Sequence, residues 1–361
     1  MKFSSTDYKA GELFCHAQSC IWLLGRSDLG DLLLNNKDPH SDFAAGVRHI
    51  DYDEFVRRKK EPALKDSRQA AKPIIFGKMG GAGAVTICLQ QRKQGPDTPC
   101  EAGPSWIMVD EVRMRGYKGT RFCILMNGSK TCGAQKATVW GKNERKIPPT
   151  CVECLECCEL LSKAWTDQWW ENRRYFNYMS TQIEQGYLIT PEMIKRWPWW
   201  GRIFRPGTRL APGEIAHHHS GMIRGGCEFT SGCNTLFQNL LAQITLSAYW
   251  RVTRECHDRA VIVPAFAHEN SRRSAYGGGE SPLYGSKAPG FLHDEILAEH
   301  PDAVFHDAAT RVGEIMVEEA AYYLPDMAPA VEAEPCVFDR WDKNAATVRD
   351  SAGRLQVWHR K

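Results

Sequence analysis

The sequence predicts an α+β protein in which short strands carry polar side chains and long helices support them. Apolar residues recur at helical spacing in several long segments, among them 235–256 and 307–323. Two short β-prone segments, at 3–7 and 291–297, place carboxylates among apolar neighbours. Helices of this length together with isolated short strands are typical of a mixed fold with an antiparallel sheet.

Composition limits the class of protein. The chain has 361 residues, 43% of them hydrophobic, which is enough for two or more lobes. The net charge of +3 gives no global preference for an acidic partner. No apolar run approaches the roughly 18 residues that span a bilayer, and the N-terminus has no signal-peptide layout, so we expect a cytoplasmic protein without membrane contact. Fourteen cysteines then indicate reduced thiols or a metal site.

In the first half of the chain, we expect a short strand and an apolar helix within 1–35. A charged segment follows at 51–72, and glycines cluster just after it. Residues 93–150 are rich in Gly, Pro, Cys and Lys and are interpreted as a loop-rich insertion. A helix should begin near Thr150, a plausible N-cap with Glu153 in the capping-box position.

In the second half, residues 197–235 are expected to form loops with short strands, followed by the long helix 235–256. A glycine-rich loop at 277–290 precedes the segment FLHDEIL, residues 291–297. FLHDEIL reads as a strand hairpin whose turn carries a histidine and two carboxylates, followed by the helix at 307–323. An acidic surface turn is the ordinary alternative for this segment.

Asp7, at the end of the first strand, is the candidate partner of Asp294 in that turn. A fold that places the two strands side by side would give a carboxylate pair able to bridge two divalent ions. One ion would activate an attacking oxygen and the other would stabilise a leaving one. Magnesium keeps several waters and needs only a few carboxylates, so this pair would suffice.

The segment SRQAAKPIIFGKMGG places two cations, an aromatic ring and a glycine at steps of four: Arg68, Lys72, Phe76 and Gly80. Such a face could hold a triphosphate and stack on a base or sugar. A solvated charged helix face is the alternative. Pro73 interrupts the pattern, so the helix either begins near it or bends there.

Read in order, the motifs DYKAGEL, RQAAKPIIFG, NTLFQ and HDE resemble those of family A DNA polymerases, the polymerase I type, and especially their bacteriophage members. Motif A is matched from Asp7 to Leu13, and motif C by residues 293–295. Arg68, Lys72 and Phe76 with its following glycine match motif B. The Asn-x3-Gln before motif C is matched by Asn234 and Gln238.

The resemblance implies a palm with an antiparallel sheet and a largely helical fingers subdomain. It implies that two magnesium ions bind Asp7 and Asp294, with Glu295 supporting the site and Lys72 protonating the leaving pyrophosphate. It implies contacts with the incoming deoxynucleotide from Tyr8, Glu12, His40, Arg68, Lys72 and Phe76. It implies contacts with primer–template DNA from Asn234, Gln238, His293, Gly80 and Gly81.

The resemblance also implies a division into palm (1–20), fingers (21–224, with a Cys-rich insertion at about 95–160) and palm again (225–361). The family has a tyrosine where Gly80 stands. Asp7 is almost the first residue, so the chain matches a C-terminal part without thumb or 3′–5′ exonuclease. A complementing chain carrying the thumb, and a host-cell cytoplasm for a phage-encoded protein, are therefore expected.

Three further patterns have an alternative each. Two cysteine pairs could form a structural zinc site, Cys123 with Cys132 and Cys151 with Cys154, although the 151–158 thiols have helical spacing and could be buried. The histidines at 217–219 are interpreted as a surface loop near DNA rather than a ligand set. Tryptophans near 165–170 and 197–200 could stack on bases but are more often core residues.

The predicted function is that of a template-directed DNA polymerase module that extends a primer with deoxynucleotides by two-metal-ion transfer. One alternative is a single-subunit phage-type RNA polymerase, which shares the motif positions; Glu12, Phe76 and the HDE triplet favour DNA. Another is an incomplete or non-catalytic subunit of a split polymerase that binds DNA and needs a partner chain.

Overall fold

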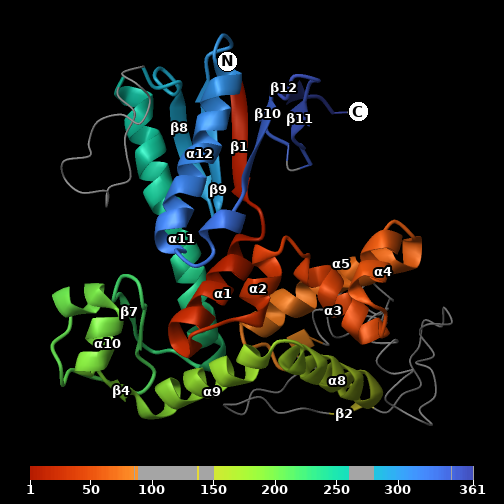
Figure 1. Cartoon of the computed structure of the whole chain (residues 1–361), viewed down its shortest axis with the longest axis vertical. Helices are drawn as coiled ribbons and strands as arrows, with labels where there is room; N and C mark the ends of the chain where they lie inside the picture. The colour runs from red at the N-terminus through yellow and green to blue at the C-terminus, as the bar shows by residue number, and fades with distance from the viewer. Residues whose placement is uncertain (85, 88–135, 138–149, 260–279, 343, 361) are drawn as a thin grey trace.

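The structure is a computed structural model that describes residues 1–84, 86–87, 136–137, 150–259, 280–342 and 344–360. The described part consists of a sheet backed by two long helices and a second, mainly helical half below it (Figure 1). The predicted α+β class, an antiparallel sheet with supporting helices plus a helical part, is confirmed. No described helix is long and apolar enough to cross a membrane.

The main sheet has six strands in the order β11-β12-β10-β1-β9-β8. Their bounds are β1 Lys2–Tyr8, β8 Lys287–Leu292, β9 Glu295–His300, β10 Ala333–Phe338, β11 Val348–Arg349 and β12 Leu355–Trp358. Neighbouring strands pair antiparallel except β10 with β12. The N-terminal strand β1 therefore lies in the middle, between two strands from the C-terminal quarter of the chain.

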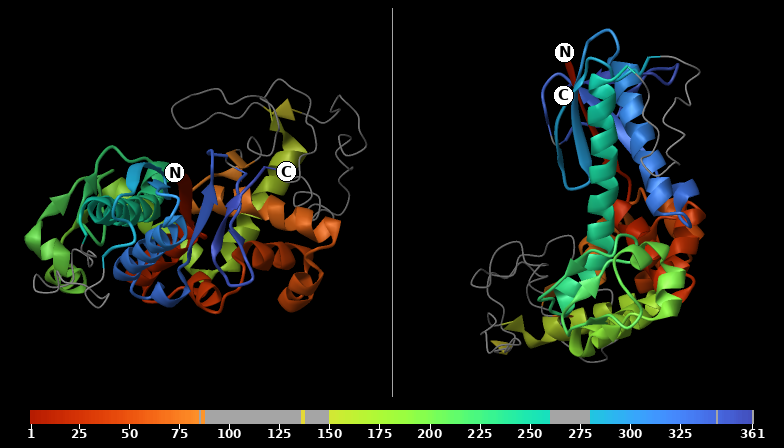
Figure 2. Two further views of the ribbon diagram at one scale, coloured as in Figure 1. Left: turned by 90° about the horizontal axis from the view of Figure 1, so that it is seen from above. Right: turned by 90° about the vertical axis from the view of Figure 1, so that its left-hand side faces the viewer.

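Helices α11 (Phe229–His257) and α12 (Phe305–Tyr323) cover one face of this sheet (Figure 2). Side chains of β1 alternate between the two faces, as in any strand. Ser4, Thr6 and Tyr8 are buried toward the helices, and the Tyr8 hydroxyl donates to the Met316 carbonyl at 2.8 Å. Asp7 therefore points to the opposite face, which none of the described helices covers.

The helical half is built from shorter elements, several of them capped by the residues that precede them. Ser27, Asp38 and Asp51 each accept a hydrogen bond from a backbone amide in the first turn of the helix that follows. The elements are α1 Gly11–Leu24, α2 Asp28–Leu34, α3 Pro39–Arg48, α4 Tyr52–Arg58, α5 Pro62–Met79, β2 Lys136–Ala137, β3 Thr150–Cys151, α8 Val152–Gln168 and α9 Trp170–Gln185. Helix α5 continues through Pro73, so Arg68, Lys72 and Phe76 share one helix.

A small lobe precedes α11 and has a core of its own. It consists of β4 Tyr187–Leu188, α10 Pro191–Arg196, η2 Pro198–Arg202, β5 Arg209–Leu210, β6 Ile215–Ala216 and β7 Ile223–Arg224. Trp197 and Trp200 are buried in it. His217 and His218 are buried as well, and the His218 ring packs 4.4 Å from the Trp197 ring. The expectation of a surface loop at 217–219 is therefore wrong for His217 and His218, whereas His219 is half-buried against Trp22 and Tyr323.

The long helices appear near their predicted positions, with differences at their ends. Helix α8 begins at Val152, because Thr150 pairs in the short strand β3 instead of capping the helix. Helix α11 starts six residues before the predicted Thr235, at Phe229, and α12 starts at Phe305. A short 3-10 turn, η4 Ala328–Ala330, connects α12 to β10. The division into palm and fingers ranges stays a prediction.

A buried ionic network joins α11 to α12 behind the sheet. Arg251 is fully buried and donates to Glu319 at 2.8 Å, while Ser247 donates to the other oxygen of that carboxylate at 2.6 Å. Arg311 likewise donates to Glu255 at 2.9 Å. Both guanidinium groups are shielded from water, so they depend on these carboxylate partners, because a buried charge without a partner is strongly unfavourable.

We expect Glu319→Ala to lower the free energy of unfolding by about 3 kcal/mol, because it removes a buried partner of Arg251. Urea denaturation followed by circular dichroism measures this change. Glu54→Ala is the matched control, since its ion pair with Arg58 is exposed and should change stability by less than about 0.5 kcal/mol. An equally small effect at Glu319 would contradict a structural role for the network.

Candidate functional site

Asp7 and Asp294 come together at the end of the central strand. Antiparallel pairing of β1 with β9 places Asp7 opposite Glu295, the first residue of β9. Asp294 lies in the two-residue turn before β9, where His293 adopts a left-handed conformation (φ 57°) that is uncommon outside glycine. The predicted hairpin with a polar turn is therefore present, and it presents its carboxylate beside that of Asp7.

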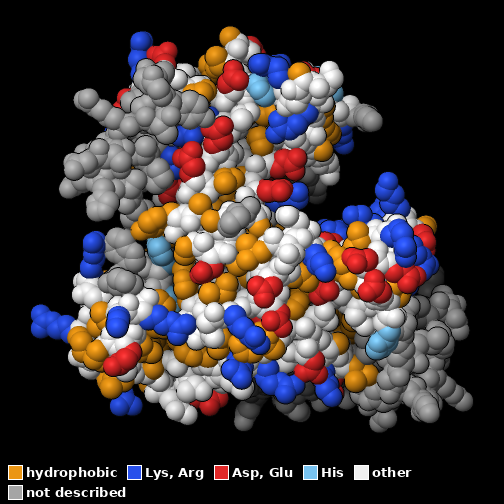
Figure 3. Space-filling view, viewed as in Figure 1, with side chains coloured by type: hydrophobic (Ala, Val, Ile, Leu, Met, Phe, Trp, Pro, Cys, Tyr) orange, Lys and Arg blue, Asp and Glu red, His pale blue; other side chains and the backbone are white. Residues whose placement is uncertain are grey.

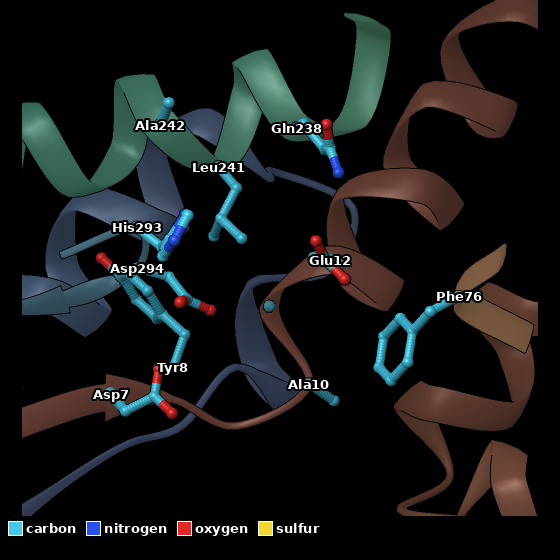
Figure 4. Close-up of a pocket in the computed structure, with 11 residues that line it drawn as sticks. Asp7, Tyr8, Ala10, Glu12, Phe76, Gln238, Leu241, Ala242, His293 and Asp294 are labelled. Atoms are coloured by element: carbon cyan, nitrogen blue, oxygen red, sulfur yellow. The ribbon is translucent and has the colours of Figure 1, made fainter. Parts of the chain in front are cut away.

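These carboxylates border a cavity of about 580 Å³ between the two halves of the molecule (Figure 4). Strand β1, the β8–β9 turn, α1, α5 and α11 each contribute side chains. The lining residues are Asp7, Tyr8, Ala10, Gly11, Glu12, Phe76, Gln238, Leu241, Ala242, His293 and Asp294. The cavity therefore gathers residues of all three predicted polymerase motifs and of the Asn-x3-Gln segment.

The carboxylates of this site repel one another. Partial burial in the cleft, followed by the negative charges of Asp294 and Glu295, raises the pKa of Asp7 to about 7. Burial also raises the pKa of Asp294. Glu295 is held in place by a hydrogen bond from the Ser5 hydroxyl. With a pKa of about 7, the Asp7 carboxyl is partly protonated at neutral pH. A bound cation would take the place of that proton and would offset the negative charge of the neighbouring carboxylates.

The donor chemistry fits magnesium. Asp7 and Asp294 offer hard oxygen donors at an open cavity, and magnesium binds through one or two carboxylates while keeping waters. Within the described residues, no group of three or more His, Cys, Asp or Glu side chains is placed so that it could hold a metal ion, so an ion here would depend on the two aspartates and on water. The predicted zinc ligands Cys123 and Cys132, and the side chains of Cys151 and Cys154, lie outside what the structure describes.

The turn from β1 into α1 forms one wall of the cavity. Ala10 has a left-handed backbone (φ 59°), and Gly11 approaches α11 so closely that a Cβ would lie 2.9 Å from a Leu241 methyl group. This close approach places Glu12 in the first turn of α1 and opposite Gln238. Burial and the charge of Asp294 raise the pKa of Glu12, whereas a hydrogen bond from Gln238 lowers it.

Helix α5 forms the facing wall. Phe76 lines the cavity, and its ring centroid lies 5.4 Å from that of His40, which is buried on α3. Burial lowers the pKa of His40 to about 4, so its ring is neutral at pH 7. Arg68 donates to Asp38 at 2.5 Å, and Lys72, one turn further along, is half-buried. Of the face predicted for 68–76, Phe76 lines the cavity and the two cations do not, so their contact with a triphosphate stays a prediction.

Gly80 and Gly81 follow the end of α5 and meet α11. A Cβ at residue 80 would lie 2.5 Å from the Asn234 side-chain oxygen, and one at residue 81 would lie 3.0 Å from the Phe229 ring. Gly81 also has a positive φ of 80°. The two glycines thus permit close packing of α5 on α11, and contact with DNA by these residues stays a prediction.

Some lining residues were not singled out from the sequence. Leu241 and Ala242 lie one turn beyond Gln238 on α11, so helical spacing from that glutamine could have indicated them. Ser5 lies two residues before Asp7 and hence on the same face of β1. Its hydrogen bond to Glu295 depends on strand register, which the sequence does not reveal.

The metal-free protein should lose stability as the pH rises, because the folded-state pKa of Asp7 is raised from 3.8 to about 7. The protonated form is favoured on folding, so the contribution of Asp7 is complete below about pH 4 and lost through about pH 7. We expect the stability of wild type relative to Asp7→Asn to fall across this range in EDTA. Urea denaturation at several pH values measures it.

Magnesium should restore more stability to wild type at high pH than at low pH, because it replaces the proton. The Asp7→Asn variant should gain much less. A pH-independent difference between the two proteins would contradict the raised pKa.

Comparison with known proteins finds similarity among solved structures. No protein-family model matches the chain, and no curated protein matches it. Among solved structures, the chain is similar to the POL domain of Pol1 from M. smegmatis in complex with DNA primer-template and dNTP. The identity is 14%, the TM-score is 0.47, and the match covers 93% of this chain and 39% of that chain. The present chain thus spans about two fifths of the length of the structure it matches.

Proposed function

We propose that this chain is the palm and fingers module of a family A, bacteriophage-type DNA polymerase, which adds deoxynucleotides to a primer 3′ end on a template. The observation that carries the proposal is the cavity where Asp7 and Asp294 meet. The same cavity is lined by Glu12, Phe76 and Gln238, from three helices of different parts of the chain. A carboxylate pair facing an aromatic ring and amide donors is suited to a nucleotide and a cation together.

In this proposal, the primer 3′-hydroxyl gives its proton to a solvent water, its oxygen forms a bond to the α-phosphorus, and the bond from that phosphorus to the oxygen shared with the β-phosphate breaks. The pyrophosphate leaves with the electron pair. Two magnesium ions, when bound, lower the energy of the attacking and leaving oxygens. Asp7 and Asp294 would hold these ions, and Glu295, fixed by Ser5, would keep the turn in place. Lys72 would supply the proton that the pyrophosphate accepts.

The incoming nucleotide would lie between α1 and α5. Phe76 would pack on its sugar and base, and His40 would offer a neutral N–H to the phosphates. Arg68 would bind the triphosphate while Asp38 holds its guanidinium. Glu12, bonded to Gln238, would occupy the space beside the sugar C2′ and so exclude a 2′-hydroxyl. Asn234, Gln238 and His293 would contact the primer–template end.

The test is primer extension by the purified chain with magnesium, using deoxynucleotides and ribonucleotides in parallel. Template-directed addition of deoxynucleotides supports the proposal, and preference for ribonucleotides would favour an RNA polymerase. Activity that appears only after addition of a chain carrying a thumb would favour the split enzyme. No addition under either condition would reject a polymerase.

Asp294→Asn should reduce the rate of nucleotide addition by at least about 10³-fold, because it removes a metal-binding carboxylate but keeps the size of the side chain. Rapid-quench measurement of a single addition gives the rate. Asp302→Asn is the matched control, since that residue pairs with the N-terminus on the surface and should leave the rate unchanged. Retained activity in Asp294→Asn would reject the metal assignment.

Glu12→Ala should relax sugar discrimination, because it opens space beside the cavity wall and removes the hydrogen bond with Gln238. We expect the ratio of kcat/KM for deoxynucleotide over ribonucleotide to fall by about 10²-fold, the amount that a lost steric contact in a fitted pocket can supply. Steady-state extension with each nucleotide measures the ratio. An unchanged ratio would show that another residue selects the sugar.

A further inference from the structure

A second cavity, of about 420 Å³, lies on the other side of Asp7. Four carboxylates line it, from β1, β9, β10 and the segment after β10: Asp7, Glu295, Glu334 and Asp342. Lys9 lines it too and is the one cationic side chain among the lining residues that the structure describes. The two cavities share Asp7 and Tyr8, so they meet at the proposed metal site.

The second cavity lies on the side of β1 where β10 pairs with it. In Figures 1 and 2, β10 lies on the side of β1 that faces α3 and α5, whereas the β8–β9 hairpin and α11 lie on the opposite side. The space-filling view shows a notch between the sheet half and the arm formed by α3 to α5 (Figure 3). Lys9 follows the end of β1 and precedes α1, so it lies where the sheet half meets the helical half, whereas Arg68 and Lys72 belong to α5 in the arm.

The backbone of Lys9 is held by a hydrogen bond, whereas its side chain forms an exposed ion pair with Glu332. Its amide donates to the Glu332 carbonyl at 3.0 Å, which ties the end of β1 to the residues before β10. Its ammonium group donates to the Glu332 carboxylate at 2.8 Å, but the two side chains are 65% and 61% exposed. An exposed ion pair of this kind contributes little to stability, so a more highly charged anion can replace the glutamate.

We propose that Lys9 binds the β- and γ-phosphates of the incoming nucleotide and then the leaving pyrophosphate, exchanging Glu332 for a phosphate oxygen. This inference rests on the proposed nucleotidyl transfer. The leaving group gains negative charge when the α-phosphorus bond breaks, and the carboxylates around it oppose that charge unless cations offset it. Lys9 follows Asp7 by two residues and lines the cavity that contains Asp7, so it can offset that charge from the sheet side.

Because Lys9 pairs with Glu332, variants of the two residues can distinguish phosphate binding by Lys9 from a purely structural ion pair. If the ion pair only joined two loops, Lys9→Gln and Glu332→Gln would act alike. If Lys9 binds phosphate, Lys9→Gln weakens binding, and Glu332→Gln strengthens it by freeing the ammonium group. The loss caused by Lys9→Gln should then be larger when Glu332 is already glutamine.

The experiment measures binding of inorganic pyrophosphate with magnesium to the full chain by isothermal titration calorimetry. We expect Lys9→Gln to raise Kd about fivefold, the effect of one partly exposed charge pair. Lys9→Arg should retain most of the affinity. Lys2→Gln is the matched control, because Lys2 lies at the far end of β1 and pairs with Asp339. In primer extension, Lys9→Gln should raise KM for the deoxynucleotide and also lower kcat, because Lys9 would contact both the bound triphosphate and the leaving pyrophosphate.

Equal pyrophosphate affinity of wild type and Lys9→Gln, with both proteins folded by circular dichroism, would overturn the role of Lys9 and leave the polymerase proposal standing. The same holds if Lys9→Gln and Glu332→Gln weaken binding equally. If wild type extends no primer and binds no pyrophosphate, the proposed function and the role of Lys9 fall together.

Discussion

The antiparallel pairing of β1 with β9 is the constraint on which the rest of the site depends. It brings the first residues of the chain beside a hairpin near its end and places Asp7 opposite Glu295. Because side chains alternate along a strand, a slip of one residue would turn Asp7 toward α12 and expose Tyr8 in its place. The Tyr8 hydroxyl bond to Met316 and the burial of Thr6 oppose such a slip. Register, rather than the presence of two aspartates, thus creates the carboxylate pair.

Helix α11 extends this constraint to the second half of the molecule. Its C-terminal part packs on α12 and on the β8–β9 hairpin, and its N-terminal part reaches α1, α9 and the end of α5. Gln238 therefore faces Glu12 across the same cavity that the two aspartates border. The buried pairs of Arg251 with Glu319 and Arg311 with Glu255 fix α11 against α12. Because these ion pairs fix the C-terminal part of α11, the helix can hold Gln238, near its N-terminal end, in position at the cavity.

Motif residues and long helices could be predicted from the sequence because each depends on local spacing. Arg68, Lys72 and Phe76 recur at the four-residue step of a helix face, although the structure was needed to show that the helix continues through Pro73. The hairpin at 291–297 follows from apolar residues on both sides of a polar turn. What could not be predicted depends on contacts between distant segments. His217 and His218 are polar in sequence but are buried, His218 against two tryptophans. Thr150 has a good capping sequence but pairs in a strand. The cavity that contains Lys9 requires β10 beside β1, which no spacing reveals.

The central claim is that Asp7 and Asp294 form one cation site. Manganese, which replaces magnesium at oxygen ligands and is paramagnetic, tests it directly by electron paramagnetic resonance. With primer–template and a non-hydrolysable deoxynucleotide, the account predicts a pair of bound ions whose spins are coupled at the short separation of two-metal sites, and loss of this signal in both Asp7→Asn and Asp294→Asn. Manganese binding that is the same in wild type and in both variants would contradict it.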